Sequence, residues 1–222
     1  MQLRIHKEGW VYFIILLIIC IISFPFFPFI GLTFFILAIY IFYFFRDPVR
    51  SVPFGDLIIS PADGIVTFIG ESNPPININQ NIKFIKISIF LSIFNVHVNR
   101  IPTKGIIKKI KYINGKYINA TSDKSSKDNE RNIVLLEKEN NDLIIFTQIA
   151  GLIARRIVCE IKETQKVNQG DKFGIIKFGS RVDLYMPVNY KPLISVGQIT
   201  IGGETILANP NNINEITKTI KI

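Results

Sequence analysis

The strongest constraint on the fold is an uncharged, almost wholly apolar stretch that runs from Trp10 to Phe45. Pro25 and Pro28 interrupt it, because proline lacks the amide donor of a helix and disfavours helical backbone in the preceding residue. The sequence therefore predicts two short apolar helices, at about 10–24 and 29–45, joined as a hairpin. At ~1.5 Å per residue each arm is roughly 24 Å long, against a hydrocarbon core of about 30 Å. The hairpin either crosses a thin bilayer or enters it as a re-entrant wedge.

Basic residues flank the apolar stretch on both sides, with Arg4 and Lys7 before it and Arg46 and Arg50 after it. Because lysine and arginine mark the cytoplasmic side, both ends are predicted in the cytoplasm, at the cell (inner) membrane. A cleaved signal peptide is the alternative, but the stretch is too long for one and shows no clear small-residue cleavage site. We therefore expect a retained membrane anchor over residues 1–50, and a catalytic domain on the cytoplasmic side over 51–222.

The formal net charge of +9 narrows the choice of partners. A basic domain held at a bilayer is expected to meet anionic membrane lipid. The aromatic residues that a single-strand nucleic-acid binder would stack on bases are concentrated in the apolar stretch, so no nucleic-acid partner is expected. Cys20 lies in that stretch and Cys159 in a predicted strand. A disulfide between them is therefore not expected, in keeping with a reducing compartment.

Beyond Pro53 the sequence changes to short β-branched and aromatic runs separated by Gly, Pro, Asn and Asp. These runs are typical of strands, and they lie at 63–70, 82–93, 105–113, 131–139, 142–150, 155–162, 173–179 and 181–187. The predicted fold is mainly β, a β-sandwich or barrel-like catalytic domain preceded by the N-terminal helical membrane hairpin. Asn114-Gly115 is a pair preferred in two-residue hairpin turns, and the polar segment 119–131 is predicted to be a long loop.

The small number of histidines limits the acid-base chemistry that the chain can perform. It has two histidines, His6 before the apolar stretch and His97 in "NVHVN". Any imidazole that works near neutral pH in the β domain must therefore be His97. Catalytic zinc sites rich in histidine need two or three imidazoles, so no metal is expected. Asp63, in "SPADG", is a further candidate, although Asp-Gly is also a common turn pair.

Seven motifs follow one another in the order shown by one enzyme family. They are FFRDPVR, ISPADGIV, FLSIFNVHVNRIP, GKYINATSDKSSKDNERN, QIAGLIARRIV, VNQGDKFGIIKFGSRVDLYMP and VGQITIGGETILA. Each motif is weak by itself, but the ordered set covers most of the chain and is specific. On these motifs the chain resembles the phosphatidylserine decarboxylase proenzymes, in the short form with an N-terminal membrane segment.

The resemblance implies self-cleavage between Gly179 and Ser180, into chains 1–179 and 180–222 that remain together as a heterodimer. Glycine has no Cβ and tolerates the crowded backbone that forms when the Ser180 hydroxyl attacks the preceding carbonyl. Elimination and loss of ammonia would then convert Ser180 into a covalent pyruvoyl group, the cofactor. The resemblance further implies that this group forms a Schiff base with phosphatidylserine, and that the reaction yields phosphatidylethanolamine and carbon dioxide.

The same resemblance implies that His97 is the general base for Ser180 and that Asp63 orients and stabilises the imidazolium, as in a serine protease triad. The match is incomplete at the histidine. Longer bacterial forms carry two histidines three residues apart, and aligning their proline with Pro102 places His97 on the first and Arg100 on the second. His97 keeps the role because the β domain has no other imidazole.

Two other classes remain open. A membrane-anchored serine peptidase would use Ser180, His97 and Asp63 on other chains, although Gly-Ser-Arg lacks the context of a nucleophile elbow. A non-enzymatic binding module of the lipoyl or biotinyl type would carry its group on Lys172, in "VNQGDKFG". The sequence also leaves open the oligomeric state and the role of Arg181 beside the cleavage site.

Overall fold

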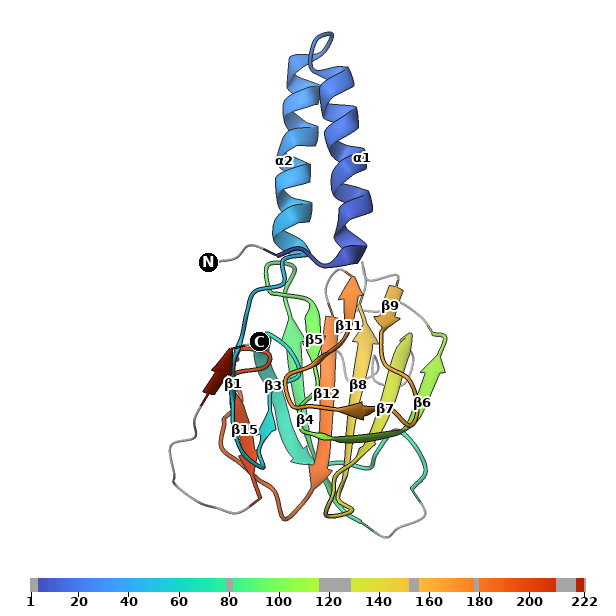
Figure 1. The fold of residues 1–222 in the computed structure, drawn as a ribbon, viewed down its shortest axis with the longest axis vertical. Helices are drawn as coiled ribbons and strands as arrows, with labels where there is room; N and C mark the ends of the chain where they lie inside the picture. The colour runs from blue at the N-terminus through green and yellow to red at the C-terminus, as the bar shows by residue number, and fades with distance from the viewer. Residues whose placement is uncertain are drawn as a thin grey trace.

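The structure is a computed structural model that describes residues 4–78, 82–115, 129–151, 156–177, 180–210 and 219–221. Two helices form a hairpin that stands on one end of a β domain (Figure 1). The prediction of a mainly β fold preceded by two N-terminal helices is confirmed.

The apolar stretch folds into α1 (Lys7–Ser23) and α2 (Pro28–Phe44). The imidazole of His6 caps α1 by accepting a hydrogen bond from the amide of Glu8. α2 begins at Pro28, where proline is tolerated because the first helical amides have no partner within the helix. Along most of the hairpin, large apolar side chains are exposed. Within the described residues, no helix is long and apolar enough to cross a membrane.

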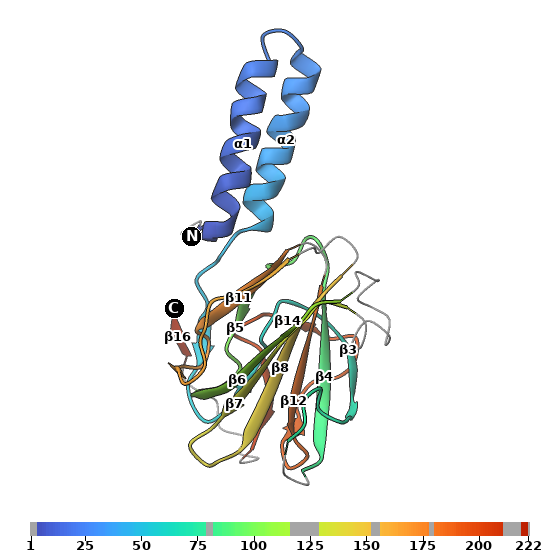
Figure 2. The ribbon, with the colours of Figure 1, turned by 90° about the vertical axis from the view of Figure 1, so that its right-hand side faces the viewer.

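An antiparallel sheet of eight strands forms the body of the β domain and curls into a half-barrel (Figure 2). Its strands, in spatial order, are β10 (Lys166–Val167), β6 (Gly105–Ile113), β7 (Arg131–Glu137), β8 (Leu143–Ala150), β12 (Ser180–Pro187), β4 (Phe84–Leu91), β3 (Gly64–Glu71) and β14 (Ile199–Thr200). The curl agrees with the twist that adjacent antiparallel strands accumulate across a wide sheet. The strand that begins with Ser180 lies near the centre of this sheet, between β8 and β4.

Three smaller sheets complete the described part of the domain. They are β5 (Val98–Arg100), β11 (Lys172–Lys177) and β9 (Arg156–Cys159); β13 (Lys191–Pro192), β15 (Ile206–Asn209) and β2 (Ile58–Ile59); and β1 (Ser51–Pro53) with β16 (Thr219–Lys221). The sheet that contains β11 packs on the large sheet, where the rings of Phe173 and Phe146 lie 4.7 Å apart, edge to face. Each of the eight predicted apolar runs contains a strand. The Gly, Pro and Asn residues between the runs favour the turns and loops that separate these strands.

The base of the hairpin packs on the three-stranded sheet that contains β11. Phe44 and Phe45, at the end of α2, share a buried cluster with Val98 of β5 and Ile175 of β11. Gly9 of α1 allows the two helices to approach, since an added Cβ would lie 2.5 Å from the Cβ of Phe45. The hairpin and the β domain therefore share a packed apolar cluster.

The prediction of a two-residue hairpin turn at Asn114-Gly115 is wrong. Ile113 at the end of β6 pairs with Arg131 at the start of β7, so the connection between these strands spans residues 114–130. The pairing of two long strands along the sheet outweighs the local turn preference of one residue pair. Residues 116–128, which include most of the predicted loop, lie outside the described residues.

Candidate active site

Ser180 is the first residue of β12, where it pairs with Leu91 of β4 on one side and Ala150 of β8 on the other. Its side chain is fully buried, and its hydroxyl oxygen has no hydrogen-bond partner among the described atoms. Leaving a buried hydroxyl without a partner costs free energy, and a catalytic role is one explanation for such a group. Gly179, the other half of the predicted cleavage site, lies outside the described residues.

His97 lies directly before β5 and is also fully buried. Its Nδ1 atom is 3.0 Å from the carbonyl oxygen of Asn95, and its Nε2 atom has no hydrogen-bond partner among the described atoms. The ring of Phe44, at the end of α2, covers the imidazole at a centroid distance of 4.1 Å. Burial under this apolar cover lowers the pKa of His97 to about 4, so the imidazole is neutral at pH 7.

The chain path brings His97 and Ser180 to the same end of the domain. The carbonyl oxygen of His97 accepts a hydrogen bond from the amide of Ile176 in β11, and Ser180 follows Ile176 by four residues. β11 runs toward the helices and β12 runs away from them (Figure 1). Both predicted residues therefore lie at the end of the β domain on which the hairpin stands.

Asp63 lies at this end too, directly before β3. Ser180 pairs with Leu91 of β4, and the preceding Phe90 pairs with Ile65 of β3. Two strand spacings separate β12 from β3, so the backbones of Asp63 and Ser180 are about 10 Å apart by the usual spacing of strands. Sheet register thus places the aspartate in the neighbourhood of the serine.

The carboxylate of Asp63 forms its hydrogen bonds with other partners than His97. It accepts two from Arg50, at 2.8 and 2.9 Å, and one from the amide of Gly202 at 2.8 Å. Burial raises the pKa of Asp63, and the positive charge of Arg50 opposes that rise. Within the described residues, the three predicted site residues are gathered at one end without the chain of hydrogen bonds that defines a serine protease triad.

Arg46 is a positive charge that acts on both His97 and Asp63, a role beyond that of a basic residue flanking the apolar stretch. Its guanidinium donates to the carbonyl oxygens of Tyr43 and Phe94, at 2.7 and 2.8 Å. After the larger effect of burial, its positive charge acts to lower the pKa of both His97 and Asp63. Its place in the motif FFRDPVR was the available signal for a role at the site.

Arg100 aligns with the second histidine of the longer forms, and its contacts connect segments of the fold. Its buried guanidinium donates to the carbonyl oxygens of Gly170 and Pro48, and it forms an ion pair of 3.1 Å with Asp47. Asp47 also forms an ion pair with Lys172. Arg100 therefore joins the segment after α2 to the β domain, and the lysine considered as a carrier site is held by a carboxylate.

Arg181, next to Ser180 on β12, is buried and forms an ion pair of 2.9 Å with Asp183 on the same strand. This pairing compensates its charge inside the sheet.

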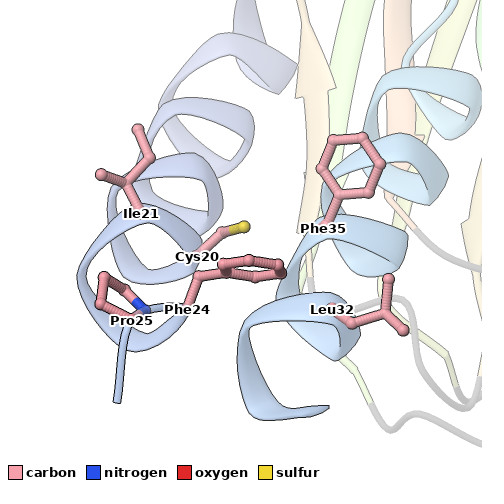
Figure 3. A pocket seen from close by; sticks show the side chains of 6 residues that line it. All are labelled: Cys20, Ile21, Phe24, Pro25, Leu32 and Phe35. Carbon is pink, nitrogen blue, oxygen red and sulfur yellow. The ribbon is translucent and has the colours of Figure 1, made fainter. Parts of the chain in front are cut away.

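A separate apolar hollow of about 530 Å³ lies between the helices at the tip of the hairpin (Figure 3). Its lining consists of Cys20, Ile21, Phe24, Pro25, Leu32 and Phe35. The tip is the end of the hairpin farthest from the β domain (Figure 1), so this hollow is distinct from the site of Ser180 and His97.

Comparison with known proteins places this arrangement in an enzyme family. The family model described as phosphatidylserine decarboxylase matches residues 37–208. That segment contains the three candidate site residues and most of the β domain. The chain belongs to the phosphatidylserine decarboxylase family.

Curated relatives match nearly the whole chain. A protein named phosphatidylserine decarboxylase proenzyme from Ehrlichia chaffeensis is 50% identical over 207 residues, which cover 92% of this chain and 91% of the relative. The proteins of the same name from Rickettsia prowazekii and from Wolbachia sp. subsp. Brugia malayi are 48% and 45% identical, over 92% and 95% of this chain and 90% and 93% of their own lengths. The resemblance predicted from the ordered motifs is confirmed.

Proposed function

We propose that this chain cuts itself between Gly179 and Ser180 and then decarboxylates phosphatidylserine to phosphatidylethanolamine and carbon dioxide. The observation that carries the proposal is the hydroxyl of Ser180, buried and without a hydrogen-bond partner among the described atoms. A fully buried hydroxyl cannot reach another protein chain, whereas the carbonyl of the preceding residue is adjacent through the backbone. The curated relatives are named as proenzymes, which supports a precursor that is processed.

The cut proceeds by displacement at the peptide bond. The oxygen of Ser180 bonds to the carbonyl carbon of Gly179 as the amide nitrogen leaves, and the product is an ester with a free amine. Loss of the α-proton of residue 180 breaks the ester and releases Gly179 as a carboxylate. Water then replaces the nitrogen, which departs as ammonia, and a pyruvoyl group remains at the start of the small chain.

His97 is proposed as the base that takes the proton of the Ser180 hydroxyl. When Nδ1 donates to the carbonyl of Asn95, the lone pair of Nε2 is left available as a proton acceptor. The low pKa keeps the imidazole neutral at working pH. The carbonyl of Asn95 thus fixes the tautomer, which in a protease triad is the task of the aspartate.

Asp63 is proposed to stabilise the positive charge that forms on His97 during the cut. Its hydrogen bonds go to Arg50 and Gly202, so its influence on the imidazolium is a charge effect across the site. The positive charge of Arg46, which disfavours an imidazolium, also acts on Asp63, so the two groups share a charged neighbour. We therefore assign Asp63 an electrostatic role and assign the orientation of the ring to Asn95.

The surroundings of Ser180 fit the pyruvoyl group expected in the mature enzyme, because its oxygen has no protein partner to lose when the side chain is converted. Once formed, the group supplies the electron sink for loss of carbon dioxide from an amino acid. Strands β4 and β8 pair with residue 180 on its two sides, so the group forms at a fixed position in the sheet.

The two chains produced by the cut are proposed to stay together. β12 belongs to the chain 180–222, and it pairs along its length with β4 and β8 of the chain 1–179. Removing a central strand would break both ladders and open the main core. A heterodimer of the cleavage products is therefore the expected mature form.

The hairpin is proposed to insert into the cell (inner) membrane, with the β domain on its cytoplasmic side. Its exposed apolar side chains have no cover in the described structure. Insertion would bring the Ser180 end of the domain to the bilayer, where the headgroup of phosphatidylserine lies. The net charge of +9 favours a surface that contains this anionic lipid.

Two alternatives are less consistent with the geometry. A peptidase acting on other chains needs its serine accessible in the intact chain, where Ser180 is fully buried. In a carrier module the lysine is free for modification, whereas the Lys172 ammonium, on a side chain that is 41% exposed, forms an ion pair with Asp47.

Substitution of Ser180 tests the proposal. Ser180→Ala should abolish both the cut and decarboxylation, because alanine has no oxygen to attack or to leave. Ser180→Cys should still cut to some extent, since a thiol can attack the same carbonyl. Its decarboxylation should follow only the fraction of small chains that carry a ketone. Cleavage of the alanine variant at this bond, measured by gel and mass, would contradict the proposal.

A further inference from the structure

Lys177 is a nearly buried cation at the end of β11, two residues before Gly179. Its Nζ atom donates a hydrogen bond to Oε2 of Glu8 at 2.8 Å, and the side chain of Lys177 is 7% exposed. The hydroxyl of Tyr12 lies 3.5 Å from the same Nζ, and the ring of Tyr12 lies 5.3 Å from it. Glu8 and Tyr12 are both residues of α1.

This ion pair joins the hairpin to the strand that leads into the cleavage site. Buried cations are costly unless they are paired, so the pairing holds the end of β11 against the first turn of α1. The hydrogen bond from Lys177 lowers the pKa of Glu8, which keeps its carboxylate ionised at neutral pH.

The base of the hairpin also contacts His97, the candidate general base. The ring of Tyr12 stacks on Phe45 at a centroid distance of 5.8 Å, and the neighbouring Phe44 covers His97. The base of the hairpin thus contacts both the strand before the scissile bond and the imidazole proposed to act on it.

We propose that Glu8 and Lys177 are positioning residues for self-cleavage, and that the hairpin forms part of the processing site. This inference rests on the proposed function. Three residue steps separate Lys177 from Ser180, a reach of at most ~11 Å, so fixing one end restricts where the carbonyl of Gly179 can lie. Attack on a carbonyl depends steeply on placement, and a displacement of ~1 Å can slow such a step by roughly a hundredfold.

The neighbouring Lys7 supplies a matched control. It also forms an ion pair from the first turn of α1 to the β domain, at 2.9 Å from Glu160, but its partner lies away from the scissile segment. Lys7→Gln therefore removes a second ion pair between the hairpin and the β domain, one whose lysine side chain is 72% exposed, without touching Lys177.

The experiment uses the full chain, synthesised without cells in the presence of vesicles of phosphatidylethanolamine and phosphatidylglycerol, and follows the loss of precursor on gels. Glu8→Gln and Lys177→Met should each slow the cut by about tenfold or more. Lys7→Gln should cut at the rate of the unmodified chain. Lys177→Arg, which can keep the ion pair, should restore most of the rate that Lys177→Met loses.

The double variant of Glu8→Gln and Lys177→Met distinguishes a pair from two unrelated defects. Residues that act through one interaction are not additive, so the double variant should be no slower than Lys177→Met alone. Equal slowing by Lys7→Gln, or failure of Lys177→Arg to recover the rate, would show general loosening of the hairpin and overturn the proposal.

The outcomes also separate this inference from the proposed function. If the unmodified chain is not cut at residue 180, the proposed function fails. If it is cut and Glu8→Gln is cut at the same rate, only the positioning role fails.

Discussion

The buried environment of His97 predicts an unusual pH dependence of self-cleavage. A general base must be neutral to accept a proton, so the rate falls as the pH drops through the pKa of the imidazole in the folded chain. That pKa is about 4 because the ring is buried beneath Phe44. At pH 5 such an imidazole is about nine-tenths neutral, whereas one with the ordinary pKa of 6.5 is roughly 3% neutral.

The rate of the cut should therefore change by less than about twofold between pH 7 and pH 5, where an ordinary histidine would lose about 25-fold. The assay refolds denatured precursor into detergent micelles buffered at a series of pH values and measures the first-order appearance of the small chain. Ser180→Ala precursor provides the blank at each pH.

Phe44→Ala tests the cause of the shift. Removal of the ring lets water reach His97, so the pKa should rise toward 6.5 and the cut should slow at pH 5 relative to pH 7. A loss of about 25-fold in the unmodified chain over this interval would refute the reasoning, as would a profile left unchanged by Phe44→Ala.

Three further substitutions follow from the contacts. Asp63→Asn should slow the cut by roughly tenfold, the effect of losing one charge at about 10 Å, the backbone spacing of Asp63 and Ser180, at an effective dielectric constant of ~20. An unchanged rate would reduce Asp63 to a turn residue. Gly9→Val should lower the free energy of unfolding by about 1–3 kcal/mol, because its side chain meets Phe45; thermal unfolding in detergent that matches the parent would contradict this packing. Arg100→Met should cost about 3–5 kcal/mol in the same assay, because it breaks a buried ion pair with Asp47, and a neutral effect would count against a structural role.

The strands and the serine could be predicted from the sequence because their signals are local. Apolar runs bounded by Gly, Pro and Asn mark β3, β4, β6 to β9, β11 and β12. The motif KFGSRVDLYMP identifies Ser180. Its burial follows from the position of β12 between β8 and β4 in the large sheet. The Asn114-Gly115 pair misled because a local preference does not reveal which strands pair over a distance.

The contacts of the hairpin with the site could not be predicted in this way. Composition identifies the helices as apolar but does not say that Phe44 covers His97 or that Glu8 pairs with Lys177, since each contact joins residues far apart in the chain. The carboxylate of Asp63 is a similar case. The triad implied by the resemblance predicts a hydrogen bond between the Asp63 carboxylate and His97. In the structure that carboxylate accepts a hydrogen bond from Arg50 instead.

The most direct test of the central claim is the intact mass of the purified protein. Self-cleavage with conversion of Ser180 predicts two chains, 1–179 and 180–222, with the small chain lighter by one ammonia than a simple hydrolysis product. Reduction with cyanoborohydride in the presence of phosphatidylserine should add the lipid to that small chain. A single uncut chain, or a small chain that begins with an ordinary serine amine and still supports full decarboxylation, would contradict the account.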